Sequence, residues 1–158
     1  MRNKYIGGVL SAVLLITAEG CSTNRDETDD GVVLDITSIA HKRPQEVKNL
    51  LGDPSKAYWQ KSMNKRMYVQ IYQPHQIEIY FPDSTQATEV VVHEPGTIPY
   101  SAEALKFFKL DVKPPSEIIP NTALKWKNYP GIQYISMLAT DIQADSVITF
   151  RIYFNLKK

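Results

Sequence analysis

The sequence is poor in residues that form covalent or metal cross-links. It contains one cysteine, Cys21, and three histidines among 158 residues. A single cysteine cannot form an intramolecular disulfide, so we expect the hydrophobic core alone to stabilise the fold. A zinc site needs about three or four converging ligands, but His41, His75 and His93 lie in separate segments without a ligand spacing. We therefore expect no metal and no cofactor.

Sequence motifs that mark common enzyme classes are also missing. There is no GxSxG nucleophile elbow, and there is no GxGxxG or GxxxxGKS/T phosphate loop. The carboxylates Glu89 and Glu94 are close in sequence, but nothing distinguishes them from ordinary exposed charge. We expect a protein that is not an enzyme.

No apolar run is long enough for a transmembrane helix, which needs roughly 20 residues. The run Ile6–Thr17 is shorter, follows Arg2 and Lys4, and is separated from Cys21 by a few mostly small residues. A basic start, a short apolar run and small residues before a cleavage point are typical of a secretory signal peptide. We assign residues 1–20 to a signal peptide and expect the protein to be exported.

The position of Cys21 after this segment resembles the lipobox of bacterial lipoproteins. In that family the cysteine is acylated, becomes the first residue of the mature chain and anchors it in a membrane. The usual lipobox has a leucine and a small residue where this chain has Ala18 and Glu19. The resemblance implies lipidation of Cys21, and Ser22 after it implies the outer membrane, facing the periplasm. The alternative is a plain secretory signal cut before Cys21, which leaves a free or oxidised thiol.

The chain has almost no excess of either charge. Without residues 1–20, 16 basic and 16 acidic side chains remain of the totals of 18 and 17. Nucleic-acid-binding proteins usually carry a basic excess, so we expect no nucleic-acid partner. Residues 21–31 are polar and acidic and cannot form a core, so we interpret them as a flexible tether that follows the lipidated cysteine. We expect residues 32–158 to form a single α+β domain.

Residue patterns predict two short helices and six strands. Pro44 suits a first helical turn and Gly52 suits the position after a last turn, which predicts a helix over 44–51. Ser101 is a good N-cap for a second helix over 102–108. Alternating or apolar runs predict strands over residues 67–72, 76–81, 88–92, 123–127, 132–138 and 146–154.

The predicted elements follow the order helix-βββ-helix-βββ. Glu46–Leu51 and Glu103–Phe108 align at a spacing of 57 residues, which indicates a possible helix-βββ pseudo-repeat. Two such blocks also arise by chance in α+β proteins. An antiparallel sheet with both helices on one face is the economical way to bury the apolar sides of all these elements. The predicted fold class is therefore α+β.

The segment HKRPQEVKNLLGDP, His41–Pro54, resembles the helix and LGxP end of small bacterial envelope lipoproteins with an α+β architecture. These include the outer-membrane assembly factor BamE and the secreted β-lactamase inhibitor proteins. The segments IEIYFPDSTQATEVVV and LKWKNYPGIQYISML are similar to parts of uncharacterised lipoproteins with that layout. The resemblance implies a domain that binds other proteins, and it implies no catalytic residues.

Strand alternation predicts a candidate partner-binding face. If Met67, Val69, Ile71 and the apolar residues of the other strands face the helices, their neighbours point the other way. The opposite face then carries four tyrosines and one arginine: Tyr68, Tyr72, Tyr80, Arg151 and Tyr153. This composition is typical of protein-binding hot spots. The alternative is that these tyrosines only stabilise the sheet through cross-strand pairs.

We therefore predict an exported, lipid-anchored, non-catalytic protein that binds an unidentified protein of the bacterial cell envelope. Two alternatives remain open. One is a periplasmic lipoprotein that binds a small molecule or glycan in a concave pocket built from Trp59, Trp126 and nearby tyrosines. The other is a secreted inhibitor of an enzyme. A flat tyrosine face favours a protein partner, whereas a deep apolar pocket favours a small ligand.

Overall fold

A computed structural model describes residues 34–62, 65–93, 98–120, 122–139 and 149–155. The predicted signal peptide, Cys21 and the predicted tether lie outside these residues, as does the start of the strand predicted over 146–154. None of the helices formed by the described residues is long and apolar enough to cross a membrane.

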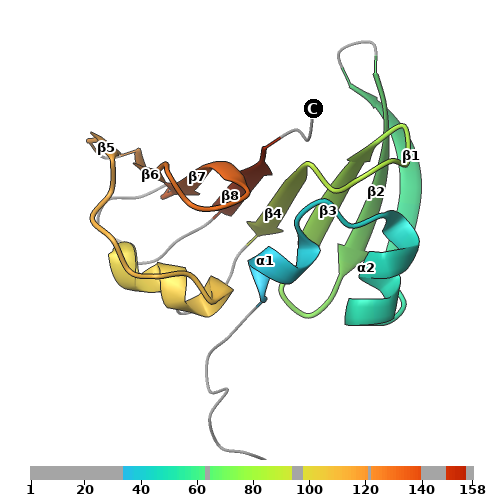
Figure 1. Cartoon of the computed structure of the whole chain (residues 1–158), viewed down its shortest axis with the longest axis horizontal. Coiled ribbons are helices and arrows are strands. Elements are labelled where there is room, and N and C mark those ends of the chain that lie inside the picture. The colour runs from blue at the N-terminus through green and yellow to red at the C-terminus, as the bar shows by residue number, and fades with distance from the viewer. Residues whose placement is uncertain (1–33, 63–64, 94–97, 121, 140–148, 156–158) are drawn as a thin grey trace, which may run out of the picture.

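The described residues form a mixed α+β fold dominated by one antiparallel sheet of eight strands (Figure 1). The strand order is β1-β2-β3-β4-β8-β7-β6-β5, so β1 and β5 are the edges and β4 meets β8 in the middle. The strands are β1 (Lys56–Ser62), β2 (Lys65–Tyr72), β3 (Ile77–Pro82), β4 (Glu89–His93), β5 (Glu117–Ile119), β6 (Ala123–Trp126), β7 (Ile132–Leu138) and β8 (Thr149–Phe154).

Three short helices accompany the sheet: α1 (Ile36–Ile39), α2 (Pro44–Leu51) and the 3-10 helix η1 (Ala102–Phe108). Asp35 caps α1, because its side chain accepts the backbone N–H of Ser38 at 3.2 Å. Helix α2 stops before Gly52, whose φ of 84° is a conformation that favours glycine. Helix α2 has the bounds predicted from the sequence, whereas residues 102–108 form a 3-10 helix.

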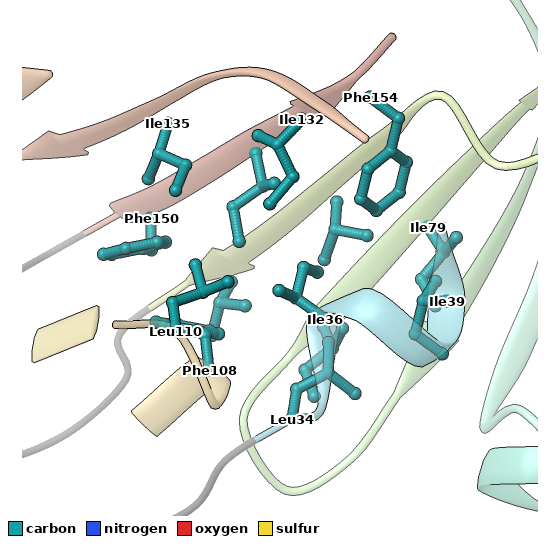
Figure 2. Close-up of a cluster of buried hydrophobic side chains, with 14 of the residues drawn as sticks. Leu34, Ile36, Ile39, Ile79, Phe108, Leu110, Ile132, Ile135, Phe150 and Phe154 are labelled. Carbon is teal, nitrogen blue, oxygen red and sulfur yellow. The ribbon is translucent and has the colours of Figure 1, made fainter. Parts of the chain in front are cut away.

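The core lies between the helices and one face of the sheet (Figure 1). Figure 2 shows Ile39 of α1 close to Ile79 of β3, and Phe108 of η1 on the same side of the sheet as Phe150 of β8. The rings of Phe108 and Phe150 stack with their centroids 4.1 Å apart and their planes 23° apart. One contiguous cluster of buried side chains therefore joins the two halves of the sheet.

The two edge strands, β1 and β5, were not predicted from the sequence. In β1, which reads KAYWQKS, the two aromatic residues are adjacent and no apolar alternation is present. Strand β5 has only three residues and follows a pair of prolines. An edge strand pairs with one neighbour only and is often short or charged, so its sequence carries a weaker periodic signal. Four strands follow each helical segment, so the predicted order helix-βββ is wrong in its strand count.

Candidate functional site

The candidate site is the face of the sheet opposite the helices, which we call the open face; no helix of the described residues covers it (Figure 1). A row of side chains crosses this face through successive strand pairs. From β1 to β7 the row contains Tyr58, Val69, Tyr80, Glu89, Tyr153 and Tyr134. Directly paired residues point to the same side of a sheet, so these six side chains form one tyrosine row.

A second row, the charged row, lies beside the tyrosine row and is displaced by two residues along each strand. From β1 to β5 it contains Lys56, Ile71, Glu78, Val91, Arg151, Ser136, Lys125 and Glu117. Val69 of the tyrosine row and Val91 of the charged row are 0% and 1% exposed. The long polar and aromatic side chains around them therefore cover the apolar centre of the open face.

Glu78 of β3 connects the two rows. It accepts a hydrogen bond from the hydroxyl of Tyr80, and Nε2 of His93 lies 3.6 Å from its Oε1. Burial raises the pKa of Tyr80, and the carboxylates of Glu78 and Glu89 raise it further. The Tyr80 hydroxyl therefore stays protonated and remains a hydrogen-bond donor near neutral pH.

Arg151 of β8 connects the two rows on the other side of β4. Its Nη1 donates to the hydroxyl of Tyr153 at 3.2 Å, and its Nε lies 3.6 Å from Oε1 of Glu89. Burial lowers the pKa of Arg151, but the hydrogen bond to Tyr153 and nearby negative charge outweigh it, so the pKa is raised. The guanidinium is therefore a fixed positive charge in the centre of the open face.

Tyr153 also connects β8 to β7. Its ring stacks on that of Tyr134, with the centroids 4.4 Å apart and the planes 25° apart. Burial raises the pKa of Tyr153, and the carboxylate of Glu89 raises it further. The two stacked rings and the adjacent guanidinium form a rigid aromatic and cationic group.

A groove of about 470 Å³ lies beside this group, at the β5–β7 end of the open face. It is lined by three cations, one carboxylate and two tyrosine rings, together with a serine and a leucine: Glu117, Lys125, Lys127, Tyr134, Ser136, Leu138, Arg151 and Tyr153. Part of the positive charge is compensated within the lining, since Nζ of Lys125 lies 3.5 Å from Oε1 of Glu117. Cationic donors beside aromatic rings can bind carboxylates and planar groups.

The structure places Tyr80, Arg151 and Tyr153 of the predicted face together on the open face. It also brings Tyr58 and Tyr134 to this face, and neither tyrosine was predicted there from the sequence. Tyr134 lies in a run that was predicted as a strand, so alternation with Ile135 could have found it. Tyr58 lies in β1, and it was not found because β1 was not predicted as a strand.

The predicted face is wrong for Tyr68 and Tyr72, which point to the helix side. Tyr68 pairs with Phe81 of β3, and Tyr72 is 5% exposed and part of the core. The β2 residues expected to face the helices lie on the open face instead: Met67, Val69 and Ile71. Strand β2 is apolar or aromatic on both of its sides, so its alternation does not decide which side is buried against the helices.

Trp59 and Trp126 do not line a common pocket. Trp59 of β1 is 45% exposed, whereas Trp126 of β6 is 1% exposed and donates its ring N–H to the carbonyl oxygen of Lys113 at 2.8 Å. Five strands separate β1 from β6, which corresponds to roughly 30 Å at the usual strand spacing. The pocket considered for a small ligand is therefore wrong in the form predicted from the sequence.

The three histidines lie in three different parts of the fold. His41 follows α1, His75 lies in the turn between β2 and β3, and His93 is the last residue of β4. Within the described ranges, no group of three or more histidine, cysteine, aspartate or glutamate side chains is placed to hold a metal ion.

Comparison with protein-family models gives no match, and comparison with curated proteins gives none. The solved structure of a cysteine-rich secretory protein from Staphylococcus aureus subsp. aureus Mu50 is similar, with a TM-score of 0.46 and 14% sequence identity. The match covers 79% of this chain and 48% of that protein, so the chain spans about half of that protein's length.

Proposed function

We propose that this chain is an exported, lipid-anchored protein of the bacterial cell envelope whose open face binds another protein. The observation that carries the proposal is the tyrosine row beside Arg151, on a sheet face that no described helix covers. The proposed role is binding without catalysis, and the proposed place is the outer membrane, facing the periplasm.

The composition and order of the open face support a protein partner. Tyrosine and arginine are enriched at the centres of protein interfaces, because they bury a large planar group and keep a polar end satisfied. Tyr134, Tyr153 and Arg151 are already held by a ring stack and a hydrogen bond. Little side-chain entropy is therefore lost when a partner covers them. A partner with aromatic and acidic side chains complements the rings, Arg151 and the lysines of the groove.

A second candidate function is the binding of a small molecule or glycan in the groove at the β5–β7 end. The groove volume of about 470 Å³ is within the usual range of ligand sites. Four of its lining side chains are charged, and a protein partner can pair with these charges while it also covers the tyrosine row, so we place the protein partner first. If Cys21 carries no lipid, the same face would suit a secreted inhibitor of an enzyme.

The proposal includes a repeat in the fold. We interpret α2 with β1–β4 and η1 with β5–β8 as two related units, each with a short helix on the same face of the sheet. The strand order supports this interpretation, because the two groups of four meet at β4 and β8 and run outward in mirrored order. In such a repeat the tyrosine row belongs to both units, so a partner that covers the row contacts both.

A photo-crosslinking amino acid at position 134 is expected to capture the partner in living bacteria that produce the full chain. Tyr134 is the probe position because its ring lines the groove and lies at the end of the tyrosine row. The matched control carries the same amino acid at Lys106 of η1, whose side chain is 67% exposed on the helix side. Adducts are separated by size and identified by mass spectrometry. The proposal requires an adduct that forms from position 134 and not from position 106.

With the captured protein purified, Tyr153→Ala is expected to weaken binding at least about tenfold, as for a central tyrosine of an interface. Lys106→Ala should change the dissociation constant by less than about twofold, because an exposed lysine outside an interface contributes little. Circular dichroism establishes that both variants are folded. Equal affinities of the wild type and Tyr153→Ala would contradict the proposed face, even if an adduct had formed.

Labelling with a tagged fatty acid tests the proposed lipid anchor on Cys21. In bacteria supplied with an alkyne-tagged fatty acid, the wild-type chain is expected to be labelled and to fractionate with membranes, and the Cys21→Ala variant is not. The thiol of Cys21 is the only cysteine sulfur that can carry the lipid. If neither form is labelled and both are soluble in the periplasm, the lipid anchor is wrong and a secreted binding protein takes its place.

A further inference from the structure

The outer end of the β1–β2 hairpin carries a surface that the open face does not include. Trp59 pairs with Tyr68, and Lys61 pairs with Arg66, so these four side chains lie on the helix side of the sheet. Figure 1 shows α2 at one end of the hairpin, while the end that carries Lys61 and Arg66 points away from it. We call these four residues the hairpin cluster.

The hairpin cluster is built around an exposed tryptophan. Trp59 is 45% exposed, and its ring lies 5.3 Å from that of Tyr68, at an angle of 52°. The guanidinium of Arg66 lies over the Trp59 ring, 4.4 Å from its centroid. This cation–π contact holds the charge beside the ring without removing either group from solvent.

The hairpin is also the most basic part of this otherwise neutral chain. Between Pro54 and Ile77 there are four lysines and arginines and no aspartate or glutamate. The acidic residue Asp83 comes close along the sheet, since its backbone N–H donates to the carbonyl oxygen of Arg66 at 2.9 Å. The single negative charge of Asp83 does not cancel the four positive charges, so the hairpin keeps an excess of positive charge.

We propose that the hairpin cluster binds the surface of an anionic phospholipid membrane. The basic side chains complement the phosphate groups, and each one near such a surface strengthens binding by about fivefold. Tryptophan suits the boundary between headgroups and acyl chains, because its ring is largely apolar and its N–H stays wet. Arg66 and Lys61 can extend their charges to the headgroups while Trp59 enters between them. This contact is separate from the protein-binding face and does not rest on it.

Quenching of Trp59 by bromine-labelled phosphatidylglycerol tests the contact directly. The mature chain, residues 21–158 with Cys21→Ser, has neither the apolar signal segment nor a lipid. It is mixed with vesicles of phosphatidylglycerol and phosphatidylcholine in equal parts, or of phosphatidylcholine alone. Trp126 is buried, so Trp59→Phe supplies the background signal from Trp126. We expect quenching with the anionic vesicles that disappears in Trp59→Phe and falls at high salt.

Variants that remove positive charges test which surface of the protein contacts the vesicles. The pair Lys61→Gln and Arg66→Gln is expected to weaken partition into anionic vesicles by about 25-fold, from about fivefold for each charge. The control pair Lys106→Gln and Lys109→Gln removes the same net charge from exposed positions outside the hairpin and should cost about twofold or less. All variants alter exposed side chains, and thermal unfolding checks that they remain folded.

Three results would overturn the proposal. One is the absence of Trp59 quenching by anionic vesicles. Another is equal quenching by vesicles with and without phosphatidylglycerol. The last is an equal loss of binding in the two charge-variant pairs, which would assign the binding to net charge and not to the hairpin cluster. None of these results bears on the open face, so the proposed function and this contact fail separately.

Discussion

Replacing Phe108 with alanine is expected to lower the free energy of unfolding by about 3–5 kcal/mol. The Phe108 side chain is 0% exposed and stacks on Phe150 of β8 (Figure 2). The substitution removes a whole buried ring and leaves a cavity that the surrounding strands can only partly fill. It also removes the ring stack, which contributes about 0.5–1.5 kcal/mol beyond the buried area.

The size of this effect tests how η1 is held. A 3-10 helix of seven residues has little stability of its own, so contacts with the sheet must hold it in place. Phe107→Ala is the matched control, because Phe107 is the neighbouring residue in the same helix and is only partly buried. It should cost about 1 kcal/mol, near the usual value for a point substitution. Urea unfolding of the three proteins measures both effects, and equal losses for the two variants would contradict the described packing of η1.

Local sequence signals were sufficient to predict the elements whose ends are marked by particular residues. Pro44 and Gly52 set the bounds of α2, and both act through backbone conformation, which depends little on the rest of the fold. Strand β3 was also predictable, because Ile77, Ile79 and Phe81 alternate with less buried residues. Strands β1 and β5 were not predictable in this way, because apolar and polar residues need not alternate along an edge strand.

The open face was harder to predict, because it depends on which strands are neighbours. Glu89 and Arg151 are 62 residues apart in sequence, and only the pairing of β4 with β8 brings them together. In β2 the difficulty is different. Val69 is 0% exposed although it lies on the open face, and Tyr72 is buried on the other side. Both sides of β2 bury apolar area, so periodicity predicts a strand there but not its orientation.

The orientation of β2 gives Tyr72 a structural role in place of the predicted binding role. Its hydroxyl donates to Oε1 of Gln70 at 3.0 Å, and the amide nitrogen of Gln70 donates to the carbonyl oxygen of Pro44 at 3.3 Å. This chain of hydrogen bonds connects β2 to the start of α2. Burial, together with the influence of Tyr68 and Asp53, raises the pKa of Tyr72 to about 12.

Tyr72→Phe is therefore expected to destabilise the protein at neutral pH but not at alkaline pH. At pH 7 the variant should be about 1 kcal/mol less stable, because Gln70 loses a buried hydrogen-bond donor. Above pH 10 the unfolded chain releases the Tyr72 proton at the ordinary pKa of about 10, while the folded chain keeps it up to about 12. The unfolded state then binds fewer protons, so stability falls by about 1.4 kcal/mol per pH unit across this window. The variant has no proton to lose and escapes this fall.

The two stabilities should thus converge as the pH rises, and be about equal near pH 11. Urea unfolding of both proteins at pH 8 and pH 11 measures this convergence. The titration of lysines also changes stability in this range, but it affects both proteins equally and cancels in the difference between them. Tyr58→Phe on the edge strand β1 controls for the loss of a hydroxyl outside the core. A stability difference between wild type and Tyr72→Phe that is the same at both pH values would contradict the buried position of this tyrosine. It would return Tyr72 to the solvent-facing side, where the sequence alone had placed it.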